Sequence, residues 1–113
     1  MQLGKGVLRL INRSKKCWDL SQAQKEVYIG KFTSKLAALR AHADIFQEEL
    51  ANIIRTLRQT YYAIEGRKRA MSWNTYLSLI FFYDAVDKTS QIIRELDAYP
   101  TQMIEQFNNA TNL

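Results

Sequence analysis

Residues capable of acid–base, nucleophilic or metal chemistry are scarce in this sequence. It contains one histidine, His42, and one cysteine, Cys17. A zinc site of the usual Cys and His type needs more ligands than these two. We therefore interpret His42 as a solvent-facing or hydrogen-bonded helix residue and Cys17 as an inert, partly exposed thiol.

The acidic side chains also lack the spacing of a catalytic or metal-binding set. Glu48 and Glu49 are adjacent and point in different directions on a helix, whereas Asp84 and Asp87 are one turn apart and can share a face. A di-metal bundle needs Glu-x-x-His pairs on several helices, and this sequence contains none. It also lacks a phosphate-binding glycine loop and a G-x-S-x-G nucleophile motif. These observations predict a protein that is not an enzyme and that uses no cofactor, metal ion or small-molecule substrate.

Positive charge is the chemistry that the sequence does carry. The 113 residues have a net charge of +5, and residues 1–72 hold 14 Lys or Arg against 6 Asp or Glu, whereas residues 73–113 hold two against five. Such asymmetry predicts a basic face for an acidic partner, and solubility with internal ion pairing is the alternative interpretation. The candidate residues for binding a polyanion or partner are Lys5, Arg9, Arg13, Lys15, Lys16, Arg67, Lys68 and Arg69.

The first of these basic clusters belongs to a segment, residues 1–20, that has an amphipathic pattern. As a helix it places Leu3, Val7, Leu10 and Ile11 on one face and most of its cations on another. Such a helix can fold onto the rest of the domain, dock into a partner's groove, contact phosphates or lie on an anionic membrane. Folding onto the domain is the interpretation we favour, and peripheral membrane contact is a lesser alternative.

Helical periodicity dominates the rest of the chain and predicts an all-α fold, a small helical bundle. One proline and four glycines leave few helix breakers, and no stretch shows the alternation of a strand. Ser21 and Gln24 have the spacing of a capping box, which begins a helix. From there, apolar residues recur at steps of three and four and keep one stripe on one side: Tyr28, Phe32, Leu36, Leu39, Ala43, Phe46, Leu50, Ile53, Leu57, Tyr61 and Ile64.

The unbroken stripe favours one long helix over residues 21–65, which would be about 65 Å long and would need a second chain to cover its excess surface, as in a coiled coil. The alternative is a break near residues 42–44, with Asp44 as the N-cap of a new helix whose first turn is acidic. Gly66 is expected to end this element in a left-handed conformation, and Ser72 to cap the next.

A second long helix is predicted over residues 73–98, and it has apolar residues on two sides. One stripe holds Tyr76, Leu79, Ile80, Tyr83, Val86 and Ile93. Because one stripe suffices for a surface helix, the second predicts either an internal helix or an interface between chains. We expect a homo-oligomer, most simply a twofold dimer, with Leu77, Phe81, Ile92 and Leu96 at the interface. A short final helix begins at Thr101, and residues 108–113 form a frayed tail.

Together these patterns predict one domain over residues 1–113. Two early glycines stand where a secretory signal peptide would have its apolar region, and with a single cysteine this favours a reducing, cytoplasmic location. The expected function is that of a non-enzymatic adaptor, assembly subunit or accessory factor that self-associates through apolar helix faces and presents its basic face to an acidic partner. The alternative is an accessory protein that binds the RNA or DNA backbone, with stacking side chains from Trp18, Tyr61, Tyr62 or Trp73.

Overall fold

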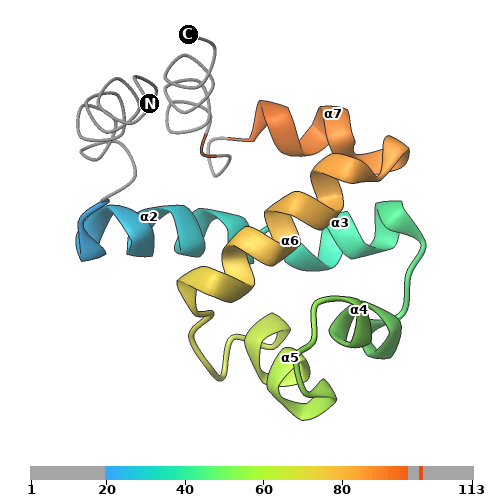
Figure 1. Ribbon diagram of the computed structural model, residues 1–113, viewed down its shortest axis with the longest axis horizontal. Coiled ribbons are helices and arrows are strands. Elements are labelled where there is room, and N and C mark those ends of the chain that lie inside the picture. The colour runs from blue at the N-terminus through green and yellow to red at the C-terminus, as the bar shows by residue number, and fades with distance from the viewer. Residues whose placement is uncertain (1–19, 97–99, 101–113) are drawn as a thin grey trace, which may run out of the picture.

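The computed structural model describes residues 20–96 and Pro100, and within these ranges the chain forms six helices and no strand (Figure 1). The all-α prediction is therefore confirmed, and the molecule is a small helical bundle. The helices are α2 (Gln22–Thr33), α3 (Leu36–Ala43), α4 (Gln47–Ile53), α5 (Arg58–Glu65), α6 (Trp73–Ala85) and α7 (Asp87–Glu95). Residues 1–19 of the predicted amphipathic segment fall outside the described residues, as do the predicted final helix, the predicted frayed tail and the predicted end of the second long helix near residue 98.

The two predicted serine caps are present. The Gln24 amide donates to Ser21 Oγ at 3.2 Å, and the Ser21 amide donates to the Gln24 side chain at 3.0 Å, so the capping box starts α2. Ser72 Oγ accepts from the Thr75 amide at 3.1 Å and starts α6. Each serine satisfies an amide that the first helical turn leaves without a partner.

The favoured single helix over residues 21–65 is wrong, and so is its coiled coil, because the longest described helix has 13 residues. The chain breaks between α2 and α3, between α3 and α4, and between α4 and α5. At the first break, Thr33 Oγ1 donates to the Ile29 carbonyl at 2.7 Å and Ser34 Oγ to the Lys31 carbonyl at 2.6 Å. Such side-chain bonds compete with those of a continuing helix.

The alternative break near residues 42–44 is confirmed, but Asp44 has a different role from the predicted one. It lies at the C-terminal end of α3 with a left-handed φ of 55°, and Phe46 is the N-cap of α4. Asp tolerates this conformation better than most residues. The predicted acidic first turn is present, since Glu48 and Glu49 lie in the first turn of α4 and the Glu49 side chain accepts from the Phe46 amide at 3.3 Å.

Three successive helices end in the same way, without a glycine at the left-handed position. Asp44, Arg55 and Arg67 have φ of 55°, 59° and 60° after α3, α4 and α5. In each case the following amide donates to the carbonyl five residues back: Ile45 to Arg40, Thr56 to Ala51 and Lys68 to Ala63. This is the Schellman arrangement. Gly66 itself has φ of −78°, so the predicted left-handed Gly66 is wrong and Arg67 takes that conformation.

The predicted helix over residues 73–98 is also divided. Val86 is extended, with φ of −84° and ψ of 123°, and separates α6 from α7. The buried Thr89 hydroxyl donates to the Tyr83 carbonyl at 2.8 Å, which satisfies an acceptor at the end of α6. The chain therefore turns at Val86, and α7 packs back on α6 (Figure 1).

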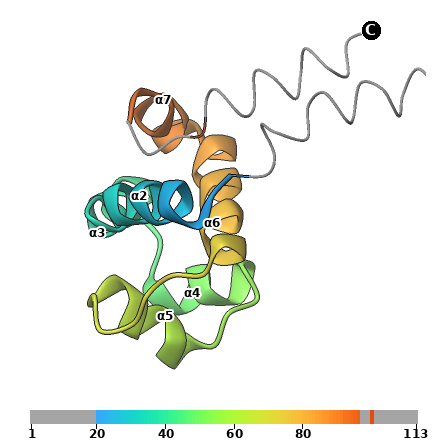
Figure 2. The same cartoon turned by 90° about the vertical axis from the view of Figure 1, so that its left-hand side faces the viewer.

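The core lies where α6 crosses the first two helices. Helix α6 packs on α2, α7 packs on α3, and α4 packs on α5 (Figure 2). Buried apolar residues come from every one of these helices: Phe32, Leu36, Leu39, Leu50, Ala51, Tyr61, Ile64, Met71, Tyr76, Leu79, Ile80, Tyr83 and Ile93. The ring of Phe32 meets Tyr76 edge-on at 5.4 Å between centroids. No described helix is long and apolar enough to cross a membrane.

Much of the predicted stripe faces this core despite the breaks. Phe32, Leu36, Leu39, Leu50, Tyr61 and Ile64 are buried, whereas Phe46, Ile53 and Leu57 are exposed. The breaks rotate the chain between helices, so a residue in register with the stripe no longer has to face inward. On α6, the four predicted inner residues, Tyr76, Leu79, Ile80 and Tyr83, are buried.

Candidate polyanion-binding groove

The basic cluster Arg67–Arg69 forms the turn that joins α5 to α6. The amides of Lys68 and Arg69 both donate to the Ala63 carbonyl, at 2.8 and 3.2 Å, so the backbone of the turn wraps the end of α5. The three consecutive cationic side chains of the turn are exposed to solvent.

This turn and one side of α2, from Gln22 to Thr33, line a groove of about 660 Å³, which we call the basic groove. Its charged lining residues are four cations, Lys25, Arg67, Lys68 and Arg69, and one acid, Glu26. A volume between about 300 and 1,000 Å³ is that of a site for a small molecule or a short chain segment. The sequence prediction found the three residues of the turn but missed Lys25, because α2 lies some 40 residues earlier in the chain.

Trp73 fixes one wall of the basic groove. Its ring stacks on Tyr76 with centroids 4.7 Å apart, and the Lys25 ammonium lies 5.6 Å from the ring centroid. A cation at this distance from an indole is attracted to it. The interaction therefore holds Lys25 beside the turn, and it also occupies the ring that a nucleic-acid base would need for stacking.

Three arginines outside the basic groove, Arg40, Arg58 and Arg94, pair with acids. Arg58 pairs with Glu48 at 3.4 Å, and Arg94 pairs with Asp84 at 2.7 Å. Within the part of the chain that the structure describes, no ion pair involves Lys25, Arg67, Lys68 or Arg69. No acid among the described residues therefore neutralises these four cations, and the same holds for Lys31, Lys35, Arg55 and Lys88.

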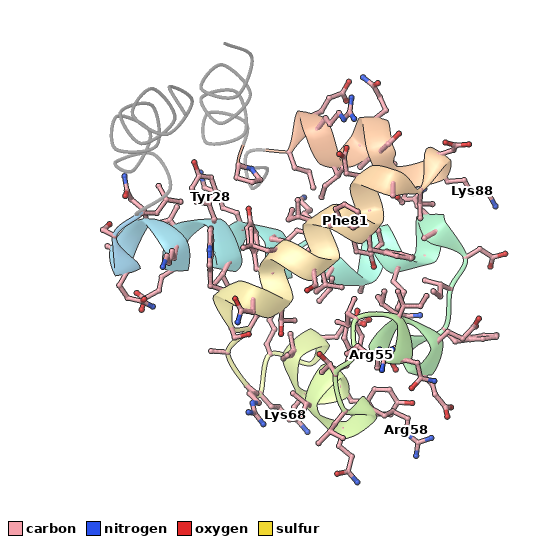
Figure 3. All side chains as sticks on the ribbon, in the orientation of Figure 1. Tyr28, Arg55, Arg58, Lys68, Phe81 and Lys88 are labelled. Atoms are coloured by element: carbon pink, nitrogen blue, oxygen red, sulfur yellow. The ribbon has the colours of Figure 1, made fainter. Side chains whose placement is uncertain are left out.

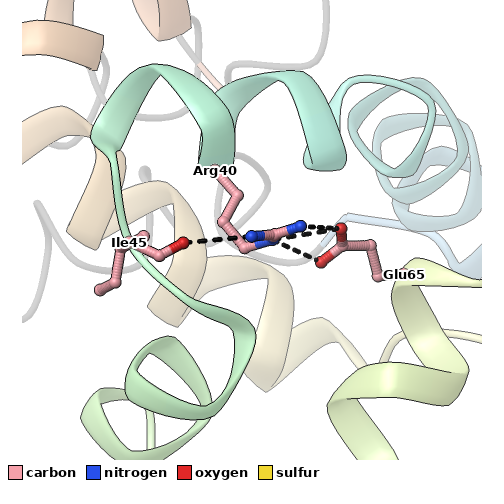
Figure 4. A network of polar contacts seen from close by, with 3 residues as sticks. All are labelled: Arg40, Ile45 and Glu65. Carbon is pink, nitrogen blue, oxygen red and sulfur yellow. Dashed lines mark hydrogen bonds and ion pairs between the residues drawn. The ribbon is translucent and has the colours of Figure 1, made fainter.

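A partly buried ion pair anchors the base of the turn (Figure 4). Arg40 on α3 donates to both carboxylate oxygens of Glu65, at 3.0 to 3.2 Å, and to the Ile45 carbonyl at 3.1 Å. The Glu65 side chain is only 8% exposed. Since Glu65 is the last residue of α5, the pair fixes the helix end from which the basic turn departs.

Charge and burial oppose each other at this pair. Burial by itself would raise the pKa of Glu65, but hydrogen bonding to Arg40, with smaller contributions from Tyr61 and Gln47, holds that pKa below its ordinary value. Hydrogen bonding to Glu65 raises the pKa of Arg40. The buried hydroxyls of Tyr61 and Tyr83 lie beside the pair, neither with a well-formed hydrogen bond to another described residue, and burial raises the pKa of both. The carboxylate is thus charged at neutral pH.

The other predicted site residues are distributed as follows. Lys5, Arg9, Arg13, Lys15 and Lys16 lie outside the described residues. Leu77 and Phe81 line a second groove, between α6 and the end of α4, whereas Ile92 and Leu96 lie at α7 and pack against the core. The four predicted interface residues therefore do not form one groove.

Residues considered for acid–base or metal chemistry remain dispersed. His42 is exposed on α3, and the turn at Val86 separates Asp84, which is paired with Arg94, from Asp87. Over residues 20–96 and Pro100, no three His, Cys, Asp or Glu side chains gather closely enough to hold a metal ion. No protein-family model, curated protein or solved structure matches the chain.

Proposed function

We propose that this protein is a noncatalytic interaction protein whose basic groove binds an acidic segment of a partner protein. The observation that carries the proposal is the presence of four cations and one acid along one groove, with no ion pair joining those cations to described acids. An exposed cluster of one sign attracts an oppositely charged partner and speeds its association.

An acidic protein segment suits the groove better than a nucleic acid. Its lining includes apolar and polar side chains, Ile29, Met71 and Thr33 among them, which can contact side chains of a peptide. Tyr61 is buried in the core, and Trp73 is stacked on Tyr76 beside Lys25. Two of the predicted stacking residues are therefore already engaged within the domain.

Binding to an RNA or DNA backbone is the second candidate function. It is favoured by the three adjacent cations of the turn, because phosphate contacts need only exposed Lys and Arg side chains. Tyr62 is an exposed aromatic side chain on the surface of α5. The Arg58 guanidinium lies over its ring, 5.8 Å from the ring centroid.

The test compares two variants of equal net charge. One replaces Arg67, Lys68 and Arg69 with Gln, and the matched control replaces Lys31, Lys35 and Lys88, which are exposed and outside the basic groove, with Gln. The probes are a fluorescent 15-residue poly-glutamate peptide and a fluorescent 20-nucleotide single strand, and binding is followed by anisotropy over a range of salt concentrations.

The proposal expects the peptide to bind the intact protein and the control, and to bind the turn variant at least tenfold more weakly. Equal weakening in both variants would contradict a specific groove, because net charge alone would then explain the binding. If only the oligonucleotide binds, and its salt slope falls by about 2 for three lost contacts to a single strand, the second candidate replaces the first.

A further inference from the structure

The sequence from Arg67 to Ser72 reads RKRAMS, with arginines five and three residues before the serine. Arg67 and Arg69 are the only two arginines of the chain that stand two positions apart, so no other serine or threonine has arginine at both spacings. Arginine-directed serine/threonine kinases select their substrates by such a charge pattern, because acidic side chains of the kinase pair with the arginines. The spacing therefore indicates that Ser72 is the acceptor of a phosphoryl group.

The segment between α5 and α6 is accessible to such an enzyme. Residues 66–70 and Ser72 are exposed to solvent, and no helix includes residues 66–72. Ser72 has an extended backbone, with φ of −72° and ψ of 159°. Figure 3 shows Lys68 pointing outward from the same turn. Only the residues after Ser72 are helical, and they belong to the first turn of α6, where a helix frays most readily.

Ser72 also lines the basic groove, whose charged lining residues are four cations and one acid and so sum to +3. A phosphate on the serine carries a charge of about −1.5 to −2 at pH 7. Phosphorylation therefore lowers the charge of the groove to about +1 to +1.5. The phosphate oxygens also accept hydrogen bonds from arginine and lysine side chains, so they compete for the cations that an acidic segment would contact.

We propose that Ser72 is a phosphorylation site and that its phosphate closes the basic groove to an acidic partner. The regulatory half of this inference rests on the proposed function, whereas the site itself does not. Ser72 Oγ bonds to the γ-phosphorus of ATP as the bond to the bridging oxygen breaks, ADP leaves, and the hydroxyl proton passes to a carboxylate of the kinase. The phosphate oxygens can still accept from the Thr75 amide, so α6 keeps its cap.

The first experiment maps the site. The intact protein is incubated with the purified catalytic domain of an arginine-directed serine/threonine kinase and Mg²⁺-ATP, and the modified residue is located by mass spectrometry. We expect phosphate on Ser72 and none on Ser34. Ser34 is the internal control, because it is exposed and has Lys31 three residues before it but no arginine at either spacing.

Two variants of equal net charge test how the site is recognised. Replacing Arg67 and Arg69 with Gln is expected to slow phosphorylation of Ser72 at least tenfold, because both arginine contacts to the kinase are lost. Replacing Lys31 and Lys35 with Gln, which are exposed and outside the basic groove, is expected to leave the rate unchanged.

The second experiment measures the regulation. Anisotropy follows binding of the fluorescent poly-glutamate peptide before kinase treatment, after it, and after removal of the phosphate by a phosphatase. We expect phosphorylation to weaken binding at least tenfold and the phosphatase to restore it. Ser72→Asn is the control, because Asn also caps a helix but has no hydroxyl, so kinase treatment is expected to leave its binding unchanged. Circular dichroism verifies that each form is folded.

The outcomes separate the site from the regulation. Absence of phosphate on Ser72, or equal rates for the arginine and lysine variants, would overturn the site. Phosphate on Ser72 with unchanged peptide binding would overturn the regulation and leave the proposed function intact. A peptide that binds neither form would refute the proposed function and the regulation with it, while the mapping still decides the site.

Discussion

Of the two partners in the ion pair between Arg40 and Glu65, removal of Arg40 is expected to destabilise the fold more than removal of the Glu65 carboxylate. Arg40→Met keeps most of the apolar stem but removes the three hydrogen bonds that Arg40 donates to the Glu65 carboxylate. Because the Glu65 side chain is only 8% exposed, the charge left behind has little access to water. Breaking a buried pair by removing one partner costs about 3 to 5 kcal/mol. We expect a loss near the lower end, about 3 kcal/mol at pH 7.

The reverse substitution is expected to cost less. Glu65→Gln keeps a carbonyl acceptor at the same place, and the Arg40 side chain, 24% exposed, can make hydrogen bonds to water in its place. We therefore expect a loss of about 1 kcal/mol, the value of an ordinary hydrogen bond. In the double variant no buried charge is left alone, so its loss is expected to be smaller than the sum of the two single losses.

The pH dependence tests the same reasoning. In the intact protein the pKa of Glu65 is lowered on folding, so its contribution to stability is complete above its unfolded pKa, about 4.3, and is lost as the pH falls through the folded value. Without Arg40, burial is opposed only by the smaller contributions of Tyr61 and Gln47, so we expect burial to raise the pKa of Glu65 and the sign to reverse. The deficit of Arg40→Met is therefore largest at pH 7 and smaller at pH 4.

Urea unfolding at pH 7 and pH 4, followed by circular dichroism, measures these differences. Glu65→Gln serves as the control without a titrating carboxylate. A loss for Glu65→Gln equal to that for Arg40→Met at pH 7, or a deficit of Arg40→Met that does not change with pH, would refute the account of a buried charge.

Three further predictions concern local structure, and urea unfolding tests each of them. Arg55 has φ of 59°, so Arg55→Gly is expected to raise the free energy of unfolding by up to about 1 kcal/mol and Arg55→Ala is not; equal effects of the two would exclude backbone strain. The buried Tyr83 hydroxyl lacks a well-formed hydrogen bond, so Tyr83→Phe is expected to leave stability unchanged or raise it, whereas a loss above about 1 kcal/mol would reveal a bond. Ser72→Ala removes the cap of α6 and is expected to cost about 1 kcal/mol, while Ser78→Ala within α6 costs less; similar losses would argue against capping.

The apolar pattern predicted which side of each helix faces inward better than it predicted where each helix ends. Capping residues such as Ser21 and Ser72 carry their own chemistry, and both caps are present. The left-handed ends at Asp44, Arg55 and Arg67 involve no glycine, so composition contains no strong signal for them. Packing of the short helices on one another compensates for those conformations, and a pattern of apolar residues does not record such packing.

Only those residues of the candidate site that are adjacent in the sequence could be predicted from it. Arg67, Lys68 and Arg69 are adjacent in the sequence, and all three line the basic groove. Lys25 joins them through the packing of α2 on α6 and through its contact with Trp73. Phe81 was predicted at an interface together with Ile92, but the turn at Val86 directs α7 back onto the core and separates the two.

The packing of α7 on α3 has a consequence for the synthesis of this protein. The two helices are neighbours in space, but the ribosome completes Glu95 about 60 residues after Leu36. At typical rates of about 5 to 20 residues per second, that interval lasts about 3 to 12 s. During this time the apolar side of α3 is made without the helix that covers it. The nascent chain is therefore expected to present Leu36 and Leu39 to chaperones or to other nascent chains until α7 has emerged.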